Sequence, residues 1–154
     1  MSSKTKLINV LILAIGRVEA DREQEELPIC LTEICGISLL ERILEKSSVL
    51  ANTNFTFVFS DNDAKKYHLN RVAKILKPES FSVLVPETTK GSLCTALLAA
   101  STLDQDSELL IISANELVDV ELGSVIDGFR SDQLGGGVLV FKSIQPRYSY
   151  VRLD

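Results

Sequence analysis

The apolar residues of this chain gather into short runs that polar segments separate. The first run, residues 6–14 (KLINVLILA), is apolar almost throughout, which is typical of a strand buried on both faces of a sheet. Later runs are shorter, and a brief extended piece at residues 31–34 precedes Gly36. The strands predicted after the first are residues 55–60, 81–85, 109–113, 137–142 and 148–153.

Between these runs lie segments whose apolar positions recur with helical spacing. Residues 38–49 place Leu39, Leu40 and Ile43 at such spacing, and Ser38 is suited to cap the helix. Helices are also predicted at residues 61–76, which stop before Pro78, at 92–103 and at 120–130. Strands that alternate with helices predict an α/β domain of three layers around a mostly parallel sheet.

A sheet of this kind binds its ligands beyond the carboxyl ends of its strands. The residues that follow each predicted strand are therefore the first place to look for functional side chains. Those candidate positions come after Ala14, Ser60, Val85, Ser113 and Lys142.

The composition narrows the class of protein further. A length of 154 residues is typical of one domain, and we predict a single domain over residues 1–154. Apolar residues make up 45% and charged residues 24%, which excludes a disordered chain. The net charge of −5, without a basic stripe, argues against a nucleic-acid partner. The first apolar run is too short to span a bilayer, and charged Arg17 and Glu19 disfavour a signal peptide there, so no membrane partner is expected.

The cysteines and the single histidine do not form a recognisable site. Cys30, Cys35 and Cys94 are an odd number, and none lies in a CxxC motif or near His68 in the sequence. This usage argues against a zinc site or a disulfide framework and favours reduced thiols in the cytoplasm. We expect Cys94 in the core and His68 on the surface of the 61–76 helix.

Several segments together carry a family pattern. The segments are residues 27–31 (LPICL), 39–44 (LLERIL), 91–99 (GSLCTALLA), 113–116 (SANE), 137–141 (GVLVF) and 146–151 (PRYSYV). In this order they resemble the N-terminal portion of the sugar-phosphate and related nucleotidyltransferases. The resemblance implies a Rossmann-like fold of GT-A type, and a nucleotide or sugar phosphate as ligand.

The resemblance also implies a reaction and a set of residues. A phosphate oxygen of the acceptor attacks the α-phosphate of a nucleoside triphosphate, with catalysis by positioning, basic side chains and Mg²⁺. Arg22 falls where the family has a catalytic arginine, although an arginine of a solvated acidic loop is the plainer interpretation. Positions that match the nucleotide-binding residues are Ala14, Gly16, Gly91, Ser92, Thr95 and Asn115. Alternatively, Ser92 caps a helix and Thr95 packs in the core.

The chain departs from the family pattern where phosphate and metal should bind. Residues 17–26 carry two arginines and five acids, so this loop would repel a triphosphate. Ile29 stands where the family has a phosphate-binding lysine. Asn115 stands where the family has a metal-binding aspartate, and an amide brings no negative charge, so Mg²⁺ binding is doubtful and no metal ligand is assigned. We also expect the 154-residue form to lack the family's second metal aspartate and acceptor-binding lysine.

Two functions of different class follow from these observations. The first is a nucleotidyltransferase-like nucleotide-binding domain, related to enzymes that make nucleotide-activated sugars or phospho-alcohols for polysaccharide, and impaired or inactive in this form. The alternative is a non-catalytic protein-interaction or regulatory domain with no nucleotide ligand. A strand at residues 148–153 would leave an open edge, from which we predict a homodimer through that strand.

Overall fold

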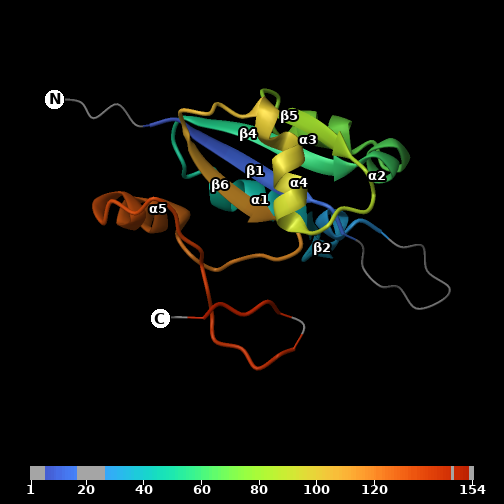
Figure 1. Cartoon of the computed structure of the whole chain (residues 1–154). Coiled ribbons are helices and arrows are strands. Elements are labelled where there is room, and N and C mark those ends of the chain that lie inside the picture. Colours follow the sequence, from blue (N-terminus) through green and yellow to red (C-terminus); the bar gives the residue numbers. More distant parts are fainter. Residues whose placement is uncertain (1–5, 17–26, 147, 153–154) are drawn as a thin grey trace. The chain divides into compact units, whose positions relative to one another are not determined.

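The computed structural model describes residues 6–16, 27–146 and 148–152 (Figure 1). The chain divides into two compact units, residues 1–122 and 123–154. The first unit holds the sheet and the helices that cover it, and the second holds one helix and the segments after it. The single domain predicted over residues 1–154 stays a prediction.

The first unit is built on a parallel sheet of four strands in the order β5-β4-β1-β6. The bounds of the strands are β1 (Ile8–Ala14), β4 (Thr53–Ser60), β5 (Phe81–Val85) and β6 (Glu108–Ser113). All seven residues of β1 are buried, because β4 and β6 flank this strand and helices cover the sheet. The predicted α/β architecture with a mostly parallel sheet is confirmed.

The two faces of the sheet are covered by different helices. Leu11 and Leu13 of β1 pack with Ala96 and Ala99 of α4 (Ser92–Ala99), which continues into η2 (Ala100–Thr102). Figure 1 shows α4 in front of the sheet and α1 (Leu39–Ser47) behind it. Because side chains alternate along a strand, neighbouring residues such as Leu11 and Ile12 serve opposite cores. This layering leaves the carboxyl ends of the strands accessible.

The helix α1 begins as the sequence predicts. The Ser38 side chain accepts a hydrogen bond from the Glu41 N–H, and the Glu41 carboxylate accepts from the Ser38 N–H at 2.9 Å, which forms a capping box. The Ser38 hydroxyl also donates to the Glu41 carboxylate at 2.6 Å, and this bond, together with the one from the Ser38 N–H, lowers the pKa of Glu41. The segment before α1 forms η1 (Ile29–Leu31) and a hairpin of β2 (Glu33–Ile34) and β3 (Ile37–Ser38), so the extended piece predicted at 31–34 is confirmed in part.

One predicted helix is interrupted. Residues 61–76 form α2 (Asp61–Lys66) and α3 (Leu69–Leu76), with His68 between them at φ 54°. In an unbroken helix, Ala64 and Leu69 would point about 140° apart. The left-handed conformation of His68 ends one helix and starts the next in a new orientation, so that the side chains of Ala64 and Leu69 are both buried. His68 is exposed as expected, but its predicted place in mid-helix is wrong.

The second unit contains α5 (Leu122–Ser131), which begins at the last residue of the first unit and confirms the helix predicted at 120–130. The strands predicted at 137–142 and 148–153 are wrong for the described residues of these segments, which form no ladder. A strand needs a hydrogen-bonding partner, and local propensity does not provide one. Instead, the rings of Phe141 and Tyr148 meet edge to face at 5.1 Å. The homodimer expected through the terminal strand stays a prediction.

Candidate functional site

A cavity of about 170 Å³ lies beyond the carboxyl ends of β1 and β6 in the first unit. The sheet order reverses there, because β4 and β5 lie on one side of β1 and β6 lies on the other. Parallel sheets bind ligands at such a switch point. The residues that line the cavity are Leu13, Ile15, Thr89, Gly91, Ser92, Thr95, Ser113 and Asn115.

One wall of this cavity is the beginning of α4. Gly91 precedes the helix at φ 105°, a conformation that favours glycine, and it has open space where a side chain would stand. The buried Thr95 hydroxyl lies 2.7 Å from the Thr89 hydroxyl and 3.2 Å from the Gly91 carbonyl oxygen, to which it donates. These bonds hold the turn before α4 against the first turn of the helix.

Ser92 does not act as the helix cap that the alternative interpretation proposed. The N-cap residue is Gly91, and no side chain caps the helix. Ser92 is the first helical residue, it is exposed, and it lines the cavity. Its hydroxyl and the N–H groups of the first turn therefore lie where a ligand can reach them.

The opposite wall comes from the ends of β1 and β6. The N–H of Ala114 donates to the Leu13 carbonyl oxygen at 2.9 Å, which extends the pairing of the two strands by one residue. Asn115 is thereby held beside Gly16. A Cβ atom on Gly16 would lie 3.0 Å from Asn115 Oδ1, and φ 144° at this position also favours glycine. The small residue lets the amide group lie on the backbone that follows β1.

The structure brings together most of the nucleotide-binding residues that the sequence predicted. Gly91, Ser92, Thr95 and Asn115 line the cavity, and Gly16 contacts Asn115. Ala14 is buried and does not line it. Because side chains alternate along β1, the neighbours of Ala14 turn toward the cavity instead.

Sequence reasoning missed other residues of this lining. These are Leu13, Ile15, Thr89 and Ser113. The alternation along β1 around Ala14 was the signal available for the first two. Ser113 is the last residue of β6, a position at which ligands were expected, whereas no local pattern distinguishes Thr89 from its neighbours.

The residues expected at the phosphates are placed only in part. Arg22 and the acidic loop lie outside the described residues. Ile29 is half-buried, and its N–H donates to the Gly16 carbonyl oxygen at 3.0 Å. The backbone of residues 27–31 is therefore tied to the end of β1, but at this position the chain presents an aliphatic side chain in place of a charge.

The described residues offer little to a metal ion at this site. The cavity lining contains no charged side chain, and Asn115 supplies one amide oxygen. Over the described ranges, no group of three or more His, Cys, Asp or Glu side chains could hold an ion. Asp119, four residues after Asn115 in the sequence, forms an ion pair with Lys46 at 3.0 Å. This set does not fit the carboxylate ligands that Mg²⁺ prefers.

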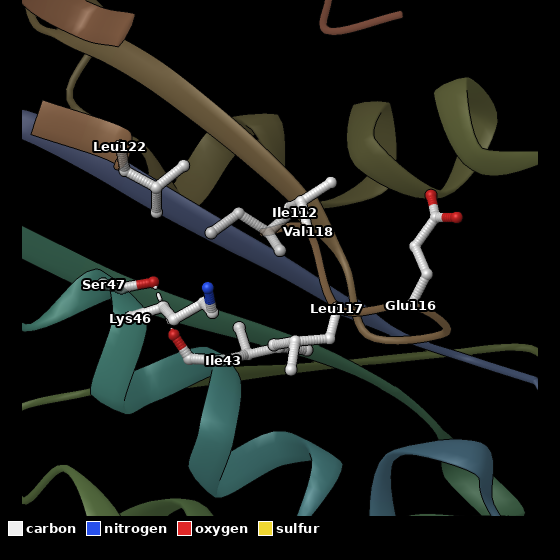
Figure 2. Close-up of a pocket in the computed structure, with 8 residues that line it drawn as sticks. All are labelled: Ile43, Lys46, Ser47, Ile112, Glu116, Leu117, Val118 and Leu122. Atoms are coloured by element: carbon white, nitrogen blue, oxygen red, sulfur yellow. Dashed lines mark hydrogen bonds between the residues drawn. The ribbon is translucent and has the colours of Figure 1, made fainter. Parts of the chain in front are cut away.

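A second, smaller cavity of about 30 Å³ lies between α1 and the segment after β6 (Figure 2). Ile43 of α1, Ile112 of β6 and Leu117 provide much of its apolar surface. In Figure 2 the Glu116 carboxylate points away from these side chains. A space of this size holds about one water molecule, so it is a packing gap and not a ligand site.

None of the three cysteines, all of which lie in the described part of the chain, lines the larger cavity. Cys30 is buried, and burial, together with the charge of Asp63, raises the pKa of its thiol to about 12. The thiolate is therefore not available near neutral pH. Cys94 is exposed, so its predicted place in the core is wrong: α4 turns Thr95, Ala96 and Ala99 inward instead.

Comparisons with known proteins identify the fold. No family model and no curated protein matches this sequence. Among solved structures, Rv0371c from Mycobacterium tuberculosis H37Rv is similar at a TM-score of 0.61 and 15% identity, covering 84% of this chain and 63% of that one. The 4-diphosphocytidyl-2C-methyl-D-erythritol synthase from Anaerococcus prevotii DSM 20548 is similar at a TM-score of 0.57 and 17% identity. This match covers 82% of this chain and 52% of the synthase chain.

A UDP-glucose pyrophosphorylase complexed with UDP-glucose is also similar, at a TM-score of 0.55 and 13% identity, covering 82% of this chain and 55% of that one. The chain thus spans less than two thirds of the length of each of these structures. The nucleotidyltransferase-like, Rossmann-like fold that the sequence predicted is confirmed.

In the described part of the chain, none of the helices is both long and apolar enough to cross a membrane.

Proposed function

We propose that this chain is a nucleotide-binding domain of nucleotidyltransferase type, with catalysis impaired or absent in the 154-residue form. It is related to enzymes that make nucleotide-activated sugars or phospho-alcohols. One observation carries the proposal: Gly91, Ser92, Thr95 and Asn115, selected from the sequence, line a single cavity at the switch point of the sheet. The cytoplasm is the proposed location.

The chemistry of the cavity supports nucleotide binding. Ser92, Ser113 and Asn115 offer both donors and acceptors, and Leu13 and Ile15 provide apolar surface. A base with polar edges and apolar faces needs this combination. The pyrophosphorylase of similar fold is complexed with UDP-glucose, which supports a nucleotide as the class of ligand.

The same residues argue against efficient phosphoryl transfer. Such catalysis depends on neutralising the charge of the phosphates with basic side chains and metal ions. Here Ile29 replaces a basic residue, Asn115 replaces a carboxylate, and residues 17–26 carry a net charge of −3 from two arginines and five acids. A bound triphosphate would therefore lack the groups that stabilise the transition state.

The second candidate function is protein interaction, and the outer face of α4 favours it. Leu93, Leu97 and Leu98 are 71%, 64% and 52% exposed. Residues 92–102 carry no charged side chain. An apolar helix face of this kind is a typical contact surface for another protein.

Calorimetric titration with the four common nucleoside triphosphates tests the proposed binding. We expect Asn115→Ala to weaken binding about two- to tenfold, as the loss of one hydrogen bond does. Asn70→Ala, an exposed position on α3, is the matched control and should bind as the natural chain does. If no triphosphate binds even at millimolar concentration, nucleotide binding is refuted and protein interaction is favoured.

A pyrophosphate-release assay with Mg²⁺ and a panel of sugar 1-phosphates tests the catalytic part. We expect no turnover above background with any of the four triphosphates. Turnover of about 1 s⁻¹ or more, the range of ordinary enzymes, would show that catalysis survives the substitutions at positions 29 and 115.

A further inference from the structure

The cavity beside α4 is polar but carries no formal charge. Its polar side chains are of two neutral kinds, namely four hydroxyls and one amide, from Thr89, Ser92, Thr95, Ser113 and Asn115. Neutral donors and acceptors recognise neutral polar edges well, because neither partner has to bring a desolvated charge into the site. The lining is therefore suited to an uncharged ligand.

The size of the cavity limits how much of a ligand it can enclose. Sites that bury a whole drug-sized ligand have volumes of roughly 300–1,000 Å³. A cavity of about 170 Å³ can enclose one ring system and part of a second. A nucleoside would fill it, and phosphate groups attached to that nucleoside would extend beyond it.

Little positive charge among the described residues would meet those phosphates. The N-terminus of α4 contributes about half an elementary charge, which at an exposed site changes affinity by at most about fivefold. Lys90 precedes Gly91 but does not line the cavity. The acidic residue Glu87 lies three residues before Lys90 in the sequence. The two side chains together add no net charge to the segment that leads into α4.

From these observations we propose that this site recognises an uncharged nucleoside, and that phosphate groups and Mg²⁺ add little to its affinity. The inference rests on the proposed nucleotide-binding function and deepens it, since it places the recognition in the base and ribose. A nucleotidyltransferase that holds its triphosphate through basic groups and metal would show the opposite preference.

Calorimetry on the full chain tests this preference. Uridine, cytidine, adenosine and guanosine are titrated beside their 5′-triphosphates, with Mg²⁺ and with EDTA, at low and at high salt. For the base that binds best, we expect the nucleoside and the triphosphate to have dissociation constants within about fivefold of each other. Mg²⁺ should leave this ratio unchanged, and the nucleoside affinity should not vary with salt.

Two results would contradict these statements in different ways. A triphosphate that binds tenfold or more tightly than its nucleoside, or that gains tenfold from Mg²⁺, overturns the inference and leaves the nucleotide-binding function standing. If neither nucleosides nor triphosphates bind, the proposed function itself fails.

Substitutions locate the binding within the molecule. Ser92→Ala should weaken nucleoside and triphosphate by the same factor, about two- to tenfold, because the hydroxyl contacts the part they share. Ser101→Ala, an exposed serine on η2 at the other end of the same helical segment, should change neither affinity. If Ser92→Ala weakens only the triphosphate, the hydroxyl contacts phosphate and the inference is wrong.

Discussion

Two apolar runs of this chain have similar compositions and opposite surroundings. β1 is buried along its whole length, with 0% of Val10, Leu11 and Ile12 exposed. Residues 138–141 of the second unit have the sequence VLVF, and their side chains are 48% to 69% exposed. The first run forms a strand, and the second, which the sequence also predicted as a strand, does not.

This difference in structure comes from the neighbouring strands and helices that each run contacts, and not from the composition of the runs themselves. β1 is hydrogen-bonded to β4 on one side and to β6 on the other, and α4 packs on one of its faces. The run at 138–141 has no ladder within the described residues of its own unit. Apolar, β-branched residues make a strand favourable only where another strand satisfies the backbone and other side chains cover the face.

The sharpest test of this contrast compares one leucine from each run. Leu11→Ala should lower the free energy of unfolding by about 2–5 kcal/mol, because it leaves a cavity in a packed core. Leu139→Ala should change it by less than about 0.5 kcal/mol, because the side chain is half-exposed. Urea denaturation of both variants measures the two values. Equal losses would mean that the second run is as well packed as the first.

The contrast between buried and exposed residues also applies to the cysteines: the thiol of Cys30 is buried and that of Cys94 is exposed. Folding raises the pKa of Cys30 from 9.0 to about 12, so the stability that the buried neutral thiol contributes is present below pH 9 and is lost as the pH rises from 9 to 12. The free energy of unfolding should fall by about 1.4 kcal/mol per pH unit over this window.

Chemical denaturation at a series of pH values measures this slope. Cys30→Ala should remove the fall, whereas Cys94→Ala, at an exposed position, should retain it. The slope is compared, and not the absolute stability, because Cys30→Ala also opens a small cavity. A slope that survives Cys30→Ala would assign the pH dependence to another group.

A third comparison is between acidic residues at the two ends of the strands: those that follow the carboxyl end of β1 and those toward the amino ends. Replacing Glu19, Glu23 and Glu25 by Gln removes three charges from the acidic loop that follows β1. This loop lies outside the described residues, so the expectation rests on charge alone. Triphosphate affinity should rise by up to roughly tenfold, less at high salt, and nucleoside affinity should stay the same.

The matched control neutralises three exposed acids toward the amino ends of the strands. Glu45→Gln, Glu79→Gln and Asp106→Asn together remove the same charge. Calorimetry at low ionic strength should detect no comparable gain for this variant. If both triple variants gain equally, net charge and not the position of the loop controls the affinity.

The smallest difference in stability is expected between two serine-to-alanine substitutions, one at a buried helix cap and one at an exposed position. The Ser60 side chain is buried and accepts a hydrogen bond from the Asp63 N–H at 3.1 Å, which caps α2. Ser60→Ala should cost about 1 kcal/mol of stability in thermal or urea unfolding. Ser101→Ala removes an exposed hydroxyl and should cost less than half of that. Equal losses of stability in the two variants would show that the capping hydrogen bond of Ser60 does not stabilise the protein.

Much of the candidate site could be predicted before the structure, because its residues carry local signals. Gly91 and Ser92 begin a helix, and Asn115 follows a strand, which are positions that a parallel sheet uses for ligands. Thr89 had no such signal. It belongs to the lining because its hydroxyl meets that of Thr95, and that contact depends on how the turn before α4 folds back.

The sequence by itself determined which segments of the first unit form strands and helices, since apolar period, length and caps such as Ser38 act within a few residues. Tertiary structure decided what depends on distant partners. It set the order β5-β4-β1-β6, broke a helix at His68 so that Ala64 and Leu69 both reach the core, and brought Gly16 against Asn115. It also decided that residues 138–141, although apolar like β1, do not form a strand. Backbone groups and apolar side chains gain free energy only from the neighbours they meet, and those neighbours lie far away along the chain.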